Sequence, residues 1–346
     1  MLFYIHETSC ISPQQTFGIT DLSELKPTIQ NQMIASEPRY ENIPDGLIRR
    51  MGKAVRIAVG AGLPLLKNHV ADGIIIGTSY GGLEDCVKFL IQIIDYEEGR
   101  LTPTNFVQST PNASAAQLSL MTGNKGYNIT HTHRGLAFEC AAIDAAMLLK
   151  ENPGSNYLLG GIDEKSDYNY AIESLGGWFK KESLSNDMLF STDSPGTIPG
   201  EGAAMFVVNN QHEGAISKLI ALKSLHSTDI SEVTSQLSLF LAENLDSGQS
   251  VDLLISGENG DSRHLPFYSE VEQMFPQSTS VIRFKHLCGE YPTSTSFALW
   301  LGTHLFTANN IPDHLYKRKS SVKNELTLIY NHFKGNQHSF MLLGSN

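Results

Sequence analysis

One stretch of this chain, residues 126–164, does most to constrain its fold. It reads GYNITHTHRGLAFECAAIDAAMLLKENPGSNYLLGGIDE. Residues 127–132 have the composition of a strand, and residues 136–150 have helical spacing with small alanines that permit close packing. Residues 157–159 form a second apolar run that ends at a pair of glycines. The stretch therefore predicts a strand, a tight turn, a buried helix and a second buried strand.

The rest of the chain repeats this alternation of buried strands and helices, which indicates an α/β fold. Two successive series of elements divide near residue 210, so we predict a duplicated architecture with one half over residues 1–210 and the other over residues 211–346. The further strands are predicted at residues 71–77, 203–208, 216–225, 251–256, 280–284, 326–330 and 339–343, and the further helices at residues 83–94, 232–244, 268–274 and 295–306.

Composition and charge exclude several classes of function. The formal net charge of -11 argues against nucleic acid or an anionic membrane surface as the main partner. No apolar run reaches the roughly 18 residues that a membrane span needs. The first residues, MLFYIHETSC, lack the basic and then apolar pattern of a signal peptide. The four cysteines are scattered without a CxxC motif, which is typical of a reduced cytoplasmic protein.

Six segments in a fixed order carry a resemblance to a known family. Besides residues 126–164, they are a basic, alanine-containing helix that Arg50 and Met51 open (RRMGKAVRIAVGAG), and the runs GTSYGG at 77–82, FVQSTPN at 106–112, GGIDE at 160–164 and GEGAA at 200–204. Together they resemble the β-ketoacyl synthases of the thiolase-fold superfamily. The resemblance implies a thiolase-like, duplicated αβαβα layered fold and a dimer, with the segment at 106–112 at the dimer interface. It implies no cofactor and no metal.

A ketosynthase needs a cysteine at the N-terminus of a buried helix, where the N–H groups lower the thiol pKa and bind the thioester oxyanion. By motif, residues 129–135 (ITHTHRG) match the family pattern VTACxSG and put Thr132 in the cysteine position. By spacing from Asn112, from the alanine-rich helix and from the GG pair, the family distances fit without a gap and put Gly135 there. Either register removes the thiolate, and an alcohol is a poor substitute for it.

The two catalytic histidines of the family are also replaced. Where the family has AHGT, this chain has SGEN, so Gly257 replaces the first histidine. In the family pattern KxxxGH, Lys285 and Gly289 are kept but Glu290 replaces the second histidine. The glycine-rich gate GFGG of the family is absent, and residues 333–336 read FKGN instead. The joint change indicates lost activity on a retained scaffold.

Such degenerate subunits resemble chain-length factors, which pair with an active ketosynthase and shape the acyl tunnel at the shared interface. The nearest parallels are the chain-length-factor-like proteins of bacterial aryl-polyene and flexirubin-type pigment pathways. The resemblance implies an acyl carrier protein as a further partner. Candidate tunnel residues are Phe106, Gln108, Thr110 and Phe138, of which Phe138 could plug the pocket or be plain core. Candidate carrier-docking residues are Arg49, Arg50, Lys53 and Arg56.

Two other functions stay open from the sequence. Glu290, Lys285 and either Thr132 or Cys288 could support thioester hydrolysis, decarboxylation or acyl transfer without condensation, because a glutamate can act as a base. Alternatively, the chain is a homodimeric scaffold that binds a carrier protein and has no acyl tunnel.

Two side-chain groups near the empty nucleophile position have alternative interpretations. His131 and His133 lie two apart on a predicted strand and with His286 suggest a metal, but no third ligand of known geometry is secure, so we favour hydrogen-bonded histidines near an interface. Arg134 could fill the space where an acyl thioester binds, or it could pair with a buried carboxylate, Glu139 or Asp163.

Overall fold

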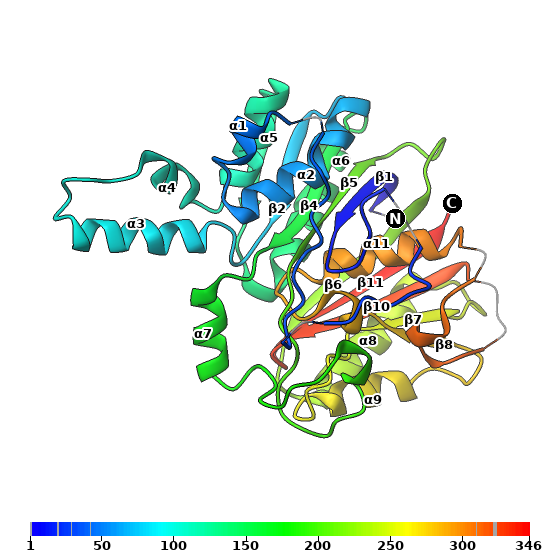
Figure 1. The fold of residues 1–346 in the computed structure, drawn as a ribbon. Coiled ribbons are helices and arrows are strands. Elements are labelled where there is room, and N and C mark those ends of the chain that lie inside the picture. Colours follow the sequence, from blue (N-terminus) through cyan, green and yellow to red (C-terminus); the bar gives the residue numbers. More distant parts are fainter. Residues whose placement is uncertain (1, 19–20, 29, 42, 309, 321–323) are drawn as a thin grey trace.

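The computed structural model describes the whole chain except residues 1, 19–20, 29, 42, 309 and 321–323. The strands form one 11-stranded sheet in the order β3-β2-β4-β5-β1-β6-β11-β10-β7-β8-β9 (Figure 1). They are β1 Phe3–Ile11, β2 Gly73–Gly77, β3 Tyr127–His131, β4 Tyr157–Asp163, β5 Gly202–Asn209, β6 Ser217–His226, β7 Leu253–Ser256, β8 Ser280–Arg283, β9 Tyr316–Arg318, β10 Leu326–Phe333 and β11 Gln337–Ser345.

The two halves of the sheet repeat one topology. The order β3-β2-β4-β5-β1 in the first half corresponds to β8-β7-β10-β11-β6 in the second. In each half the first two pairings are parallel and the last two are antiparallel. The halves join through antiparallel pairing of β1 with β6. This repeat confirms the predicted α/β fold with two similar halves, and residue 210 lies between β5 and β6.

Helices cover the two halves and fill the space between them. The main helices are α2 Lys53–Asn68, α3 Leu83–Asp95, α5 Ala113–Thr122, α6 Ala137–Glu151, α7 Asp167–Leu175, α8 Ile230–Asn244, α9 Leu265–Gln273 and α11 Thr295–Leu305. Short helices are α1 Asp45–Ile48, α4 Pro103–Gln108 and α10 Lys285–Cys288, and the 3-10 turns are η1 Arg134–Leu136, η2 Asn186–Met188 and η3 Asp313–Leu315.

Alternating side chains on the strands divide the core into layers. On β2, Ile75 faces the central layer with α6 and α11, whereas Ile74 and Ile76 pack outward against α2 and α5. On β7, Ile255 faces the same central layer and Leu254 packs outward against α8 and α9. The result is five layers of helices and sheet, as expected for a thiolase-like fold.

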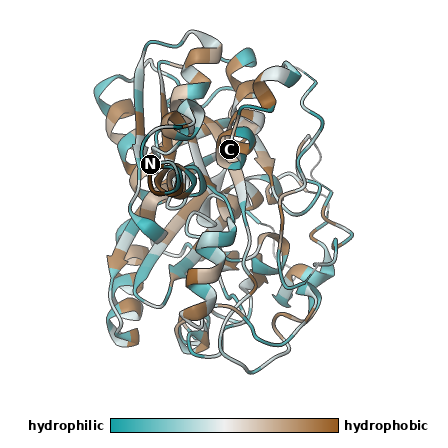
Figure 2. Ribbon diagram, turned by 60° about the vertical axis from the view of Figure 1, so that its left-hand side comes forward, coloured by the Kyte–Doolittle hydropathy of each residue, from teal (hydrophilic) through white to brown (hydrophobic). Residues whose placement is uncertain are grey.

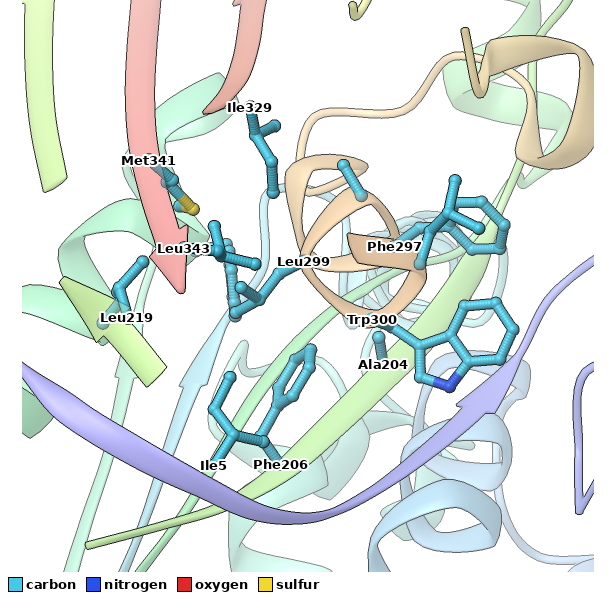
Figure 3. Packing of buried hydrophobic residues seen from close by; sticks show 14 of the residues in the cluster. Ile5, Ala204, Phe206, Leu219, Phe297, Leu299, Trp300, Ile329, Met341 and Leu343 are labelled. Carbon is cyan, nitrogen blue, oxygen red and sulfur yellow. The ribbon is translucent and has the colours of Figure 1, made fainter. Parts of the chain in front are cut away.

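The central layer is apolar almost throughout. Every residue of α11 except His304 is buried. Figure 3 shows Phe297, Leu299 and Trp300 of this helix among side chains of strands from both halves. In Figure 2 the apolar colour likewise gathers in the sheet and the inner helices, while most outer loops are polar or neutral. This core fixes the position of α6, whose first turn is the candidate site.

Three peripheral elements project from the layered body. The helices α3 and α4 form an arm that extends away from the sheet, and α7 lies below it (Figure 1). We use "the arm" for α3, α4 and the segment that joins them, residues 83–108. None of the residues of α3, all of them described, is buried.

Several elements differ from the sequence predictions. The helix predicted to open at Arg50 and Met51 begins only at Lys53, after a turn. The strand β1 and the helices α5 and α7 were not predicted, although β1 is central to the sheet. No helix in the described part of the chain is both long and apolar enough to cross a membrane.

Candidate functional site

The turn before α6 contains the position to which the resemblance assigns the family's nucleophile. The chain leaves β3 at His131, passes through η1 and enters α6 at Ala137. Gly135 is buried in this turn, and its N–H donates a hydrogen bond to Oε1 of Gln337 at 3.0 Å. Thr132 is exposed and lies before the turn. Of the two candidate residues, Gly135 is therefore the one at the buried helix tip.

The space beside Gly135 is filled by Phe333. A Cβ atom added to Gly135 would lie 2.1 Å from Cβ and 2.6 Å from Cγ of Phe333. Cβ atoms do not approach other carbon atoms this closely, so a cysteine fits at position 135 only if Phe333 moves. The site lacks a thiol and also lacks the room for one. In addition, the N–H that would face an oxyanion is occupied by Gln337.

The first histidine position is filled in the same way. Gly257 follows β7, and a Cβ atom on it would lie 2.2 Å from Oδ1 and 3.0 Å from Cα of Asn331. Asn331 is buried on β10, and its Nδ2 donates to Oγ1 of Thr295 at 2.8 Å. A histidine at position 257 would collide with this asparagine.

The second histidine position is occupied by a buried ion pair. Nζ of Lys285 lies 2.7 Å from Oε1 of Glu290 and 2.6 Å from the hydroxyl of Ser294. Asn259 donates to the other oxygen of Glu290 at 2.8 Å. Both oxygens of Glu290 are thus bound, and Lys285 is fully buried. A carboxylate held by a lysine and an amide is a weak candidate for a general base.

The missing glycine gate is replaced by a tight hairpin. Phe333 pairs with Gln337, so only residues 334–336 form the turn between β10 and β11. Lys334 and Gly335 have left-handed backbone angles, with φ of 54° and 67°. Nζ of Lys334 lies 2.5 Å from Oε2 of Glu173 on α7 and 4.5 Å from the centre of the Trp178 ring. The turn is therefore fixed to α7.

A small pocket remains between this turn and α7. Its cavity volume is about 40 Å³, whereas sites for drug-sized ligands enclose about 300–1,000 Å³. An acyl chain does not fit in it. It is lined by Tyr80, Glu173, Trp178, Phe179, Thr197, Asn259, Asp261, His264, Glu290, Tyr291, Pro292, Phe333 and Lys334.

Two buried carboxyls lie beside the former site. Burial raises the pKa of Glu139 on α6 to about 7, although the Ser339 and Thr295 hydroxyls partly offset this. Neither oxygen of Glu139 has a hydrogen bond of normal geometry within the described structure. Burial also raises the pKa of Asp163 to about 6, and this carboxyl accepts hydrogen bonds from the N–H groups of residues 79, 80 and 293. Of the two interpretations of Arg134, the pairing with Glu139 or Asp163 is not found, because Arg134 is exposed and no salt bridge between described residues joins it to either carboxyl.

The three histidines considered as metal ligands point to three different partners. Nε2 of His131 lies 2.9 Å from Asp144, that of His133 lies 3.3 Å from His226, and that of His286 lies 3.1 Å from His314. Among the described residues, no group of three or more histidines, cysteines or acidic residues is placed to hold a metal ion. The geometry matches the hydrogen-bonded alternative.

The four free cysteines do not supply a substitute nucleophile. Burial raises the pKa of Cys10 to about 12 and that of Cys288 further still, so both thiols stay protonated. Cys140 lies within α6, away from its tip, and burial raises its pKa as well. Cys86 lies on α3, in the arm.

The predicted tunnel residues fall into two sets. Phe106 and Thr110 are exposed, with 60% of Phe106 accessible. Gln108 is buried. Its Oε1 accepts a hydrogen bond from the N–H of Gly52 at 2.5 Å, and its Nε2 donates one to the carbonyl oxygen of Arg50. Phe138 is fully buried in the central core. Only the first pair is available to another molecule.

Of the four predicted docking residues, two form ion pairs within the chain and two are exposed. Lys53 pairs with Glu201 at 2.5 Å, and Arg56 pairs with Glu37 at 2.6 Å, so both charges are used inside the molecule. Arg49 and Arg50 lie before α2 and are exposed. A carrier protein would therefore meet two of the four predicted cations.

Comparisons with known proteins agree with this fold. Residues 25–175 match the family described as β-ketoacyl synthase, N-terminal domain. That stretch contains the arm, the turn at Gly135 and most of the first half. Over these residues, fewer than half of the chain, the sequence is similar to the β-ketoacyl synthase family. A search of curated proteins finds no match.

Solved structures of ketosynthases share the fold of this ketosynthase-like chain. A β-ketoacyl synthase from Burkholderia phymatum STM815 has a TM-score of 0.79 at 15% identity, with 99% of each chain covered. The ketosynthase ApeO in complex with its chain length factor ApeC, from Xenorhabdus doucetiae, has a TM-score of 0.73 at 14% identity, covering 99% of this chain and 98% of that one. AntDE:AntF, a type II acyl-carrier protein in complex with its ketosynthase, has a TM-score of 0.71 at 16% identity, with 99% of each chain covered.

Sequence reasoning located the altered positions but missed the groups that fill them. Phe333, Asn331 and Gln337 all come from the β10–β11 hairpin, far along the chain from Gly135. The one available signal was the run FKGN: replacing two glycines of the gate by larger residues indicates a different turn. Nothing in the sequence pointed to Glu173 and Trp178 as the partners of that turn.

Proposed function

We propose that this chain is a catalytically silent ketosynthase-like subunit. It pairs with an active β-ketoacyl-ACP synthase and contributes to the wall of the acyl tunnel, in the manner of a chain-length factor of a fatty-acid, polyketide or polyene pathway. The observation that carries the proposal is the filling of the site: Phe333 occupies the nucleophile position, Asn331 the first histidine position, and the Lys285–Glu290 pair the second. A site filled in this way holds no acyl thioester.

The arm supplies the surface for a partner. It exposes large apolar side chains, including Ile94 at 77%, Phe106 at 60% and Val107 at 66%. Apolar patches of this kind on a globular protein mark interaction sites. Phe89 packs against Phe106 at 5.3 Å between ring centres, so the two helices of the arm brace each other without reaching the main core.

The apolar surface continues from the arm to the edge of the sheet. The helix α4 contacts α5, and both α5 and α6 flank β3, the edge strand. Leu120 on α5, Tyr127 on β3 and Met147 on α6 are exposed along this edge. An open edge strand flanked by exposed apolar side chains favours pairing with another chain.

The related structures support the kind of partner. One is a ketosynthase in complex with a chain length factor, and another is a ketosynthase in complex with an acyl-carrier protein. By analogy, Phe106 on the arm and Thr110 just after it contact the partner and meet its tunnel there. Arg49 and Arg50, the two exposed cations before α2, are the proposed contacts for an acidic carrier protein.

Coexpression with an active ketosynthase from the same gene neighbourhood tests the pairing. We expect the two chains to copurify and to elute together as a heterodimer on size exclusion. The Ile94→Asp variant should lose the complex, whereas Leu175→Asp should keep it, because Leu175 is 90% exposed on α7 and lies outside the arm. A stable homodimer that ignores the ketosynthase would support the scaffold alternative instead.

The alternative of altered thioester chemistry has no observation in its favour, since Glu290 is bound at both oxygens. Turnover of acyl-carrier thioesters by the isolated chain, lost in Glu290→Gln, would reinstate it. We expect no turnover by either protein.

A further inference from the structure

We propose that the pocket between α7 and the β10–β11 turn is a binding cage for a primary ammonium group, and that Lys334 is its resident occupant. Nζ of Lys334 lies 4.5 Å from the centre of the Trp178 ring and 5.1 Å from that of Phe333. It pairs with Glu173 at 2.5 Å. Aromatic faces together with a carboxylate are the groups that recognise alkylammonium ligands.

Glu173 is positioned for this role by a second bond. The hydroxyl of Tyr80 donates to its Oε1 at 2.9 Å, which leaves Oε2 to face Lys334. The side chain of Glu173 is only 15% exposed and that of Lys334 only 26%. Solvent and salt therefore screen this pair less than they screen an ion pair at the open surface.

The other carboxylates of the pocket are already paired. Asp261 lies 2.6 Å from Arg263, and Glu290 lies 2.7 Å from Lys285. Once Lys334 is removed, Glu173 is therefore the carboxylate of this pocket that an incoming ammonium group would meet. The Trp178 ring stacks on the His264 ring, with 6.0 Å between the ring centres. This contact fixes the orientation of Trp178 before any ligand binds.

Occupancy of the cage also holds the turn in place. Lys334 has a left-handed backbone angle, φ 54°, which non-glycine residues adopt rarely. The next residue, Gly335, packs so closely on His264 that an added Cβ would lie 2.8 Å from that ring. Phe333, the preceding residue, fills the space beside Gly135. Lys334 therefore acts as a latch that keeps Phe333 in the nucleophile position. The latch role rests on the proposed function, whereas the cage is tested on the isolated chain without a partner.

Tryptophan fluorescence offers a direct readout. The chain has two tryptophans, and Trp300 is only 2% exposed, so acrylamide quenching reports on Trp178. Lys334→Ala removes the atoms from Cγ to Nζ, which correspond to n-propylammonium. We expect this variant to show stronger quenching and a red-shifted emission. Added n-propylammonium should reverse both changes saturably, and n-propanol or an equal concentration of sodium chloride should not.

A second variant distinguishes ammonium binding in the cage from exposure of Trp178 caused merely by loss of the Lys334 side chain. Glu173→Gln keeps the Lys334 side chain, so stronger quenching in this variant comes only from release of the latch. In the double variant Lys334→Ala, Glu173→Gln, n-propylammonium should no longer protect Trp178. Lys319→Ala, which breaks an exposed pair with Asp313, is the matched control and should behave like the unaltered chain.

Two results would overturn the inference. One is a folded Lys334→Ala protein, verified by circular dichroism, in which n-propylammonium gives no saturable protection. The other is equal protection with and without Glu173, which would mean that the carboxylate takes no part. If Lys334→Ala does not fold, unchanged quenching in Glu173→Gln still contradicts the latch. Failure to pair with a ketosynthase would affect none of these results.

Discussion

The candidate site and the arm differ in which kinds of side chain they bury. At the candidate site, titratable and polar groups such as Lys285, Glu139 and Asn331 are buried, and side chains fill the space beside both glycines. In the arm, apolar groups such as Ile94 and Phe106 are exposed and no residue of α3 is buried. Side chains normally follow the reverse rule, with apolar groups inside and charges outside. Under the proposed function, the interior of this chain is structural and its exposed apolar surface binds a partner.

The largest effect is expected where the interior pair is broken. Lys285→Ala removes the cation that pairs with Glu290 and leaves a buried cavity in its place. Because breaking a buried ion pair from one side leaves an uncompensated charge, we expect a loss of about 3–5 kcal/mol in the free energy of unfolding. Urea denaturation measures it. Lys319→Ala, which breaks an exposed pair, should change the stability by less than about 0.5 kcal/mol. Similar losses in both variants would mean that the buried Lys285–Glu290 pair stabilises the fold no more than an exposed ion pair does.

The next effect concerns the arm and changes pairing rather than stability. Ile94→Asp places a charge on the apolar surface of the arm, within the proposed interface, where a well-buried contact is worth about 2 kcal/mol or more, so affinity for the ketosynthase should fall by at least about thirtyfold. Because Ile94 is 77% exposed in the isolated chain, the variant should unfold at nearly the same urea concentration as the unaltered chain. Surface plasmon resonance and urea denaturation measure the two quantities. A large loss of stability with unchanged affinity would contradict this role, because it would mean that Ile94 stabilises the isolated chain and does not contact the ketosynthase.

Much of this fold follows from the sequence alone, for identifiable reasons. Short apolar runs such as residues 73–77 and 157–163 form buried parallel strands, because both faces of each strand are covered by helices. The strand β1 escaped prediction because polar residues, among them Glu7 and Thr8, interrupt its pattern. It is held instead by backbone pairing with β5 on one side and β6 on the other.

The site could be predicted only in part. Spacing along the chain placed Gly135 at the buried helix tip, because a packed helix tolerates no insertion. The identity of the groups that fill the site could not be predicted, since Phe333 reaches Gly135 through the fold and not through any local pattern. Likewise, two of the four predicted docking cations, Lys53 and Arg56, are neutralised by distant carboxylates that a linear reading does not bring near them.

A smaller effect is expected from restoring the nucleophile alone. Gly135→Cys forces a side chain against Phe333, so overpacking should cost about 1–3 kcal/mol in the free energy of unfolding. The new thiol should gain no acyl group from an acyl-carrier thioester, because Phe333 fills the space beside it and the N–H of residue 135 is bound to Gln337. Adding Phe333→Ala should relieve the collision, although it opens a cavity of its own. Thermal unfolding of the single and double variants checks the order, and an undisturbed single variant would show that Phe333 does not fill the position.

A further predicted effect is a pH dependence of stability set by Glu139. Burial raises its pKa from 4.5 to about 7, so the folded state favours the protonated form. The stabilisation from that form is complete below pH 4.5 and is lost as the pH rises to about 7. Glu139→Gln removes this dependence. The unaltered chain should therefore lose stability relative to the variant between these two pH values, as urea denaturation at several pH values would show. A constant difference would mean that Glu139 titrates normally.

The central claim is that this chain holds no acyl group while its partner does. Intact-mass spectrometry of the copurified complex, after incubation with an acyl-carrier thioester, tests it most directly. We predict an acyl adduct on the ketosynthase and an unchanged mass for this chain. An acyl adduct on this chain, formed at a rate comparable to that of its partner, would contradict the account.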